Sequence, residues 1–176
     1  MACGTNVTPS TVPDELSPPQ EAQVGIGQYD VRVTPLQVAM VSAAVANDGV
    51  VMTPHLVQSV LGQDLSEISE TKPEQLSKAM EPETADQLTD MMKLVVEQGT
   101  GTQAAVPGVS VAGKTGTAEH ATDAPPHAWF TGFAPADNPK VAVAVVVEDG
   151  GREGNEAYGG SVAGPISSAV MKAALQ

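Results

Sequence analysis

The chain has 176 residues, a length that suits one ordinary domain, and its 8 Lys and Arg against 21 Asp and Glu give a formal net charge of −13. This acidity argues against nucleic acid or an anionic membrane as a partner, because both require a basic face. Apolar residues make up 41% of the sequence, enough for a packed core, so wholesale disorder is excluded. No apolar run reaches the roughly 18–20 residues of a membrane span, and no signal peptide is recognisable.

Residues 1–22 are predicted to form an extended, Pro-rich lead-in, because four prolines and scattered Ser and Thr disfavour regular structure there. Residues 23–176 are predicted to fold. An apolar helix is expected near the start of this part, with Thr34 as N-cap, Pro35 at the first helical position and Gln37 completing a capping box. Nearly every residue from 36 to 45 is apolar, which predicts burial on almost all sides.

The middle of the chain is predicted to contain an extended segment, a loop and a second helix. Residues 50–60 favour an extended segment or short strand, and the acidic residues 62–82 favour a solvated loop or irregular insertion. A helix is expected over residues 83–98, where apolar residues recur at helical spacing. This stripe is interpreted as core, and it comprises Leu88, Met91, Met92 and Val95.

The last third of the sequence predicts three strands in hairpin succession, followed by a helix. The strands are expected at 108–119, 127–135 and 140–149, and a flexible Gly-rich connection precedes the helix over 161–175. The predicted fold class is therefore α+β, with an antiparallel sheet covered by helices.

Two interpretations are open for the segment GVSVAGKT at residues 108–115. It fits the phosphate-binding pattern G-x-x-x-x-G-K-[ST], and the apolar strand ending in acid downstream is typical of Mg²⁺-dependent nucleotidases. A P-loop, however, requires a helix to begin at the lysine, whereas Gly116 follows Lys114-Thr115 at once. A P-loop nucleotide-binding enzyme is thus kept as an alternative hypothesis.

The second interpretation places Lys114, Thr115, Gly116 and Thr117 on an edge strand. Gly116 would let a ligand backbone lie against the strand, the threonines would offer hydroxyls, and Lys114 would offer a positive charge. These groups suit an extended, peptide-like ligand that ends in a carboxylate and binds by strand addition. A lone K-T-G also fits a solvated surface strand.

The sequence resembles the penicillin-binding transpeptidases over residues 24–175. AGKTGTAE followed by WFTGFAP and KVAVAVVVED resembles the third-motif strand of that family and its next two strands. IGQYDVRVTPLQVAMVSAAVANDGVVMTPHLV resembles the helix and strand that precede this motif, and EQGTGTQAAVPGVSVAGKTGTAEH resembles the lead-in to it. The similarity points to the high-molecular-weight class B branch and its actinobacterial members. It implies a β-lactamase-like fold.

The resemblance implies a D,D-transpeptidase, in which a serine attacks the D-Ala-D-Ala amide of a peptidoglycan stem peptide and β-lactams imitate that substrate. By this resemblance Lys114 draws the substrate carboxylate, Thr115 and Thr117 hydrogen-bond it, and Gly116 leaves room for the ligand. The Thr117 N–H would form half of the oxyanion hole. No cofactor is predicted.

Two motifs that the family needs are not found in this sequence. No S-x-N occurs, and the single S-x-x-K, at Ser69 and Lys72, is rejected as the nucleophile because Pro73 bars Lys72 from a continuing helix. The chain is therefore interpreted as the C-terminal part of the domain, lacking its N-terminal strands and nucleophile helix and inactive alone. The complete protein is expected at the extracytoplasmic face of the membrane. A non-catalytic module that complements a separate N-terminal half is the remaining alternative.

His120 and His127 flank a Pro-rich loop and could suggest a metal site. Zinc sites need three or four ligands, and no Cys or third His lies nearby in the sequence. Both are therefore predicted to be surface histidines, and no metal ligand is predicted.

Overall fold

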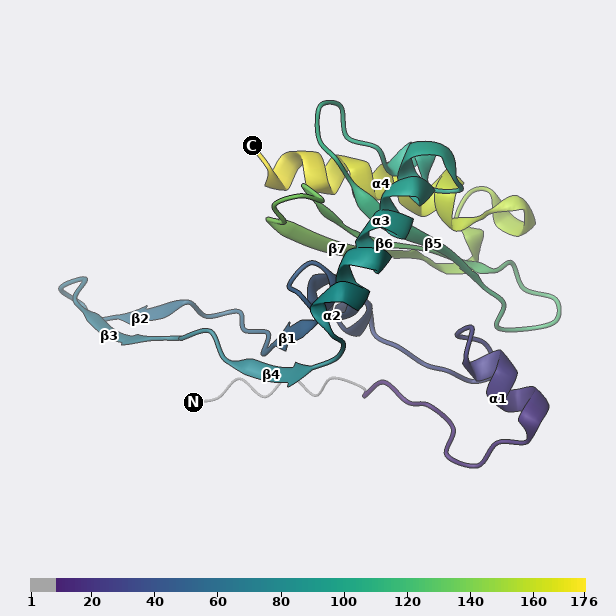
Figure 1. Ribbon diagram of the computed structural model, residues 1–176, viewed down its shortest axis with the longest axis horizontal. Coiled ribbons are helices and arrows are strands. Elements are labelled where there is room, and N and C mark those ends of the chain that lie inside the picture. The colour runs from purple at the N-terminus through teal and green to yellow at the C-terminus, as the bar shows by residue number, and fades with distance from the viewer. Residues whose placement is uncertain (1–8) are drawn as a thin grey trace.

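The computed structural model describes residues 9–176 and shows a three-stranded sheet between helices, with a two-stranded arm that extends away from it (Figure 1). Strands β5 (Ala112–Ala118), β6 (His127–Ala134) and β7 (Val141–Val147) pair antiparallel in the order β5-β6-β7. The three strands predicted from the sequence are confirmed, and β5 is an edge strand as expected. No helix within this described part is long and apolar enough to cross a membrane.

Helices cover both faces of the sheet. Alternate residues of each strand point to opposite faces, so each face contributes buried side chains to its own core. Phe130 and Phe133, three positions apart on β6, are both fully buried, one on each side. The core around Phe130 includes residues of α4 (Gly159–Ala174), and the core around Phe133 includes residues of α2 (Pro35–Val45). The predicted α+β class, with an antiparallel sheet covered by helices, is confirmed.

Helix α2 begins as the sequence predicts but is less buried than expected. The Thr34 Oγ1 accepts a hydrogen bond from the Gln37 N–H at 3.1 Å, which caps the first turn. Only Ser42, Ala44 and Val45 are buried, whereas residues such as Leu36 and Val41 remain 52% and 53% exposed. The prediction of burial on almost all sides is wrong, because within residues 9–176 the sheet covers only one side of this helix.

Helix α3 (Pro82–Gln98) confirms the second predicted helix and packs against β5. Leu88 and Met92 contact the core around Phe133. Met91 is 55% exposed, so its assignment to the core is wrong. Helix α4 confirms the predicted last helix, and its buried residues, small except for Met171, are Gly159, Gly160, Ala163, Gly164, Ser167 and Met171.

The lead-in is not extended throughout. Pro18–Val24 forms helix α1, in which two prolines occupy the first turn, where their missing N–H groups cost nothing. The Gln20 side chain accepts a hydrogen bond from the Ser17 N–H at 2.7 Å and fixes this start. The prediction for residues 1–22 is therefore wrong over this helix, and its first eight residues lie outside the described part.

Residues 62–82 are solvated but not irregular. Strand β3 (Glu67–Glu70) pairs with β2 (Ser59–Leu61), and β4 (Gln75–Lys78) pairs with β1 (Val50–Met52). Together they form the arm seen in Figure 1, and all residues of β3 and β4 are exposed. In the turn between β2 and β3, hydrogen bonds from Ser66 hold the pKa of the Asp64 carboxyl below its ordinary value.

Candidate functional site

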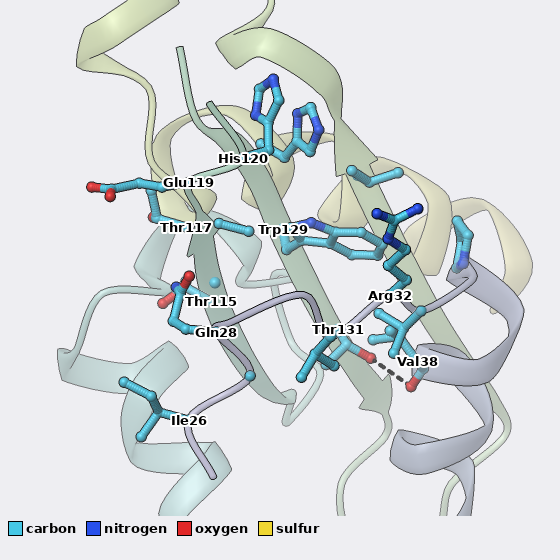
Figure 2. Close-up of a pocket in the computed structure, with 18 of the residues that line it drawn as sticks. Ile26, Gln28, Arg32, Val38, Thr115, Thr117, Glu119, His120, Trp129 and Thr131 are labelled. Carbon is cyan, nitrogen blue, oxygen red and sulfur yellow. Dashed lines mark hydrogen bonds between the residues drawn. The ribbon is translucent and has the colours of Figure 1, made fainter. Parts of the chain in front are cut away.

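An open cleft of about 790 Å³ lies beside β5 and β6 and is bounded on its other side by the segment before α2. Figure 2 shows Thr115 and Thr117 on the strand side, with Gln28 and Arg32 from the facing segment. The cleft combines cationic and anionic groups with apolar ones. The charged residues that line it are Asp30, Arg32, Lys114, Glu119 and Glu148.

Lys114 lies in the middle of β5, opposite Thr131 of β6, and its side chain is exposed toward the cleft. Its Nζ donates a hydrogen bond to the Thr115 carbonyl at 2.6 Å. Because Lys114 and Thr115 are paired strand residues, no helix begins at the lysine. The P-loop alternative is therefore wrong, since a phosphate cradle requires a flexible loop that leads into a helix N-terminus.

The two threonines of the K-T-G strand differ in their surroundings. The Thr115 Oγ1 lies 2.7 Å from the Thr100 Oγ1, and this hydrogen bond ties β5 to the segment after α3. A hydroxyl has one donor and two acceptor lone pairs, so Thr115 keeps capacity for a ligand. Thr117 is exposed near the end of the strand. All four predicted residues, Lys114, Thr115, Gly116 and Thr117, line the same cleft.

Gly116 is held in place from the far side by the start of α4. A Cβ on Gly159 would lie 2.6 Å from the Gly116 carbonyl oxygen and 2.1 Å from that of Trp129. A Cβ on Gly160 would lie 2.0 Å from the Thr100 carbonyl oxygen. These glycines were expected in a flexible connection, whereas the structure uses them for close contact between helix and strand backbones.

No serine among residues 9–176 lines this cleft. Ser42 is buried and shares a 2.6 Å hydrogen bond with the Thr131 hydroxyl, which joins α2 to β6. Ser69 lies in β3 on the exposed arm, away from β5 (Figure 1). The described residues therefore place no serine beside residues 114–117 of β5.

The structure also brings together residues that the sequence analysis left apart. His120 and His127 stack, and Asp149 from the turn after β7 joins them. A signal for this was present, because consecutive antiparallel strands place the start of β6 beside the end of β7. Asp149 was missed because its contact depends on a turn whose backbone geometry the composition does not specify.

Comparison with known proteins relates this arrangement to cell-wall enzymes. The family described as penicillin binding protein transpeptidase domain matches residues 7–172. The peptidoglycan D,D-transpeptidase PbpA of Mycolicibacterium smegmatis is 54% identical over 154 residues, which cover 86% of this chain and 31% of the relative. PbpA of Mycobacterium tuberculosis is 49% identical over 164 residues, which cover 90% of this chain and 33% of the relative. The chain thus spans about a third of the length of these curated relatives.

Solved structures of penicillin-binding proteins share the fold of this chain. A crystal structure of PBPA from Mycobacterium tuberculosis superposes with a TM-score of 0.85 at 46% identity, covering 97% of this chain and 41% of that one. The penicillin G acyl-enzyme complex of penicillin-binding protein A from the same organism gives a TM-score of 0.85 at 46% identity, covering 97% and 38%.

Proposed function

The chain belongs to the penicillin-binding protein transpeptidase family, and from that premise we propose that its strand β5 is the substrate-binding strand of a peptidoglycan D,D-transpeptidase. The observation that carries the proposal is the placement of residues 114–117 on an edge strand that borders a cleft. An edge strand can accept an extended peptide through its free backbone groups. The proposed substrate is the D-Ala-D-Ala end of a peptidoglycan stem peptide.

Lys114 supports this assignment through its charge. The protein carries a net charge of −13, so a substrate carboxylate would be repelled by most of its surface. Lys114 and Arg32 are the cationic side chains among the cleft residues, and Arg32 already pairs with Asp30 at 2.9 Å. We therefore assign the carboxylate of the stem peptide to Lys114, with the Thr115 and Thr117 hydroxyls as neutral donors.

The proposed reaction is acyl transfer through a serine ester. The serine Oγ attacks the carbonyl between the two D-Ala residues, the amide bond breaks, and the terminal D-Ala leaves as an amine that takes up a proton. An amine of a neighbouring stem then attacks the ester and releases the serine. The Thr117 N–H is proposed to hold the oxyanion of both tetrahedral intermediates. We assign the serine to the part of the domain that this chain does not span.

Two surfaces support docking of that further part. Strand β7 has no partner on its outer edge within residues 9–176, although all of its residues are Val or Ala, and such an edge favours pairing with added strands. The exposed Leu36 and Val41 of α2 add apolar surface. A separately encoded N-terminal half could occupy these surfaces as well as a covalently linked one. We propose β-lactams as covalent ligands of the complete protein, at the extracytoplasmic face of the membrane.

A chimera tests the proposal. This chain would replace the matching third of Mycolicibacterium smegmatis PbpA, and fluorescent penicillin labelling would be followed over time. We expect no label on the 176-residue chain alone and label on the folded chimera. Charge-assisted hydrogen bonds contribute about 1.5–3 kcal/mol, so Lys114→Ala should slow acylation by about 10–150-fold.

Lys140→Ala is the matched control, since Lys140 is an exposed lysine directly before β7 and does not line the cleft. A folded chimera that takes no label, or equal rates for the two lysine variants, would contradict the proposal. Supplying the rest of PbpA as a separate chain distinguishes the complementing-module alternative, which requires the two chains to co-purify and regain labelling.

A further inference from the structure

Three side chains from separate segments meet at one end of the sheet. His120 follows β5, His127 begins β6, and Asp149 lies in the turn after β7. We propose that these residues form a binding site for a divalent transition metal such as Zn²⁺. The site shares no residue with positions 114–117, although His120 and His127 line the same cleft, and it does not depend on the proposed transpeptidase activity.

The distances suit a tetrahedral ion. The His120 Nε2 lies 3.1 Å from the Asp149 Oδ1, and the His127 Nδ1 lies 3.8 Å from the same oxygen. Ligands at about 2.0–2.1 Å from a tetrahedral Zn²⁺ are about 3.4 Å from one another, and the two observed separations lie on either side of that value. One ligand atom from each of the three residues lies within 4.8 Å of the other two, so the three can close around one ion once the imidazole rings turn toward it.

The backbone turns the carboxylate toward the imidazoles. Asp149 has a φ of 51° and is followed by Gly150 and Gly151 at φ of 64° and 57°, a left-handed run that reverses the chain sharply after β7. The Asp149 N–H donates to the His127 Nδ1 at 3.1 Å, and the two imidazole rings stack with centroids 3.9 Å apart. Metal binding replaces that hydrogen bond by coordination, and it requires the two stacked rings to turn, because the lone pair of each imidazole lies in its ring plane.

The ligand types select the class of metal. Two imidazoles with one carboxylate favour Zn²⁺ and its transition-metal neighbours over Ca²⁺ and Mg²⁺, which prefer all-oxygen sites. The His120 and His127 side chains are 34% and 27% exposed, so water can reach the ion and complete its coordination. Such a bound ion would tie the β5–β6 turn to the end of β7. Because His120 and His127 also line the cleft, it would stiffen the cleft rim near Thr117.

Isothermal titration of the untagged full chain with ZnCl₂ tests the proposal, with MgCl₂ and CaCl₂ as comparison salts. We expect one saturable Zn²⁺ site per chain, a rise in melting temperature with Zn²⁺, and the intense visible absorption of tetrahedral Co²⁺ when Co²⁺ is substituted. Loss of a residue that only hydrogen-bonds a metal ligand lowers metal affinity by roughly 10–100-fold. His120→Ala and Asp149→Asn remove ligands themselves, so each should lower the Zn²⁺ association constant by more than that. Asparagine is chosen at 149 because it tolerates positive φ.

His55 provides the matched control, because it is the third histidine of the chain and lies outside the cluster. His55→Ala should bind Zn²⁺ like the unmodified chain. The proposal is overturned if Zn²⁺ shows no saturable binding at millimolar concentration, if Mg²⁺ binds equally well, or if His55→Ala loses as much affinity as His120→Ala. Circular dichroism of the metal-free variants separates loss of a ligand from loss of the fold, and the Co²⁺ spectrum of the unmodified chain needs no variant.

Discussion

The contact between Gly159 and the K-T-G strand predicts that a single methyl group should disturb both stability and site geometry. A Cβ on residue 159 would lie 2.1 Å from the Trp129 carbonyl oxygen and 2.6 Å from that of Gly116, whereas ordinary contacts begin at 3.4 Å. Helix and strand would have to separate by about 1.3 Å, the difference between 3.4 Å and 2.1 Å. Both opposing atoms belong to backbone inside a paired sheet, so neither can move like the end of a flexible side chain.

We expect Gly159→Ala to lower the free energy of unfolding of the chain by about 1–3 kcal/mol, the usual cost of overpacking. Gly164→Ala is the matched control on the same helix, because a Cβ there meets its nearest atom at an acceptable 3.4 Å. It should stabilise by about 0.5–1 kcal/mol, since alanine is the better helix former. Urea unfolding followed by circular dichroism measures both variants.

In the PbpA chimera, a shift of about 1 Å at Gly116 should slow penicillin acylation about 100-fold, because catalytic geometry tolerates little displacement. The Gly164→Ala chimera should react at the unmodified rate. Equal unfolding free energies for the two alanine variants, or equal acylation rates, would refute the claim that α4 positions the strand through Gly159.

Three further outcomes are expected. Phe133→Ala should cost about 3–5 kcal/mol in urea unfolding, because a fully buried ring between α2 and the sheet leaves a cavity, and a loss below 1 kcal/mol would contradict that packing. Gly113→Ala should lower the free energy of unfolding by about 1–3 kcal/mol, since its Cβ would lie 2.2 Å from the Phe130 ring. In a double-mutant cycle, the same change should cost less when Phe130 is replaced by Leu. Thr34→Ala should lower the free energy of unfolding by about 1 kcal/mol, because it removes the side chain that caps α2. Thr117→Ala, at an exposed strand position, should change the free energy of unfolding by less than about 0.5 kcal/mol but slow acylation of the chimera by about 2–12-fold.

The strands and the helix starts could be predicted because their signals are local. Thr34, Pro35 and Gln37 specify the beginning of α2 through contacts within four residues, and the runs that become β5, β6 and β7 are bounded by turn residues. Helical periodicity predicted burial wrongly where burial depends on which other elements pack against the helix. Met91 has helical spacing typical of core, yet it is exposed because α3 meets the sheet along the line of Leu88 and Met92.

The arm shows a different limit. The composition of residues 62–82 is polar and acidic, and that composition is compatible with either a loop or a solvated ribbon. Pairing of β4 with β1 joins residues more than 20 positions apart, so no short window carries the information. The same holds for helix α1, where the Ser17–Gln20 capping contact decides between helix and extended chain in a Pro-rich segment.

The sequence by itself determined the succession of the three strands along the chain, the class of fold, the family and the four residues of the K-T-G strand. Each of these depends on short runs of neighbouring residues. Tertiary structure alone decided what holds that strand and what lies beside it. Gly159 approaches Gly116 from 43 positions away, and Asp149 reaches His120 across two strands. Such contacts depend on how elements pack, and packing is set by the sum of many side chains rather than by any motif.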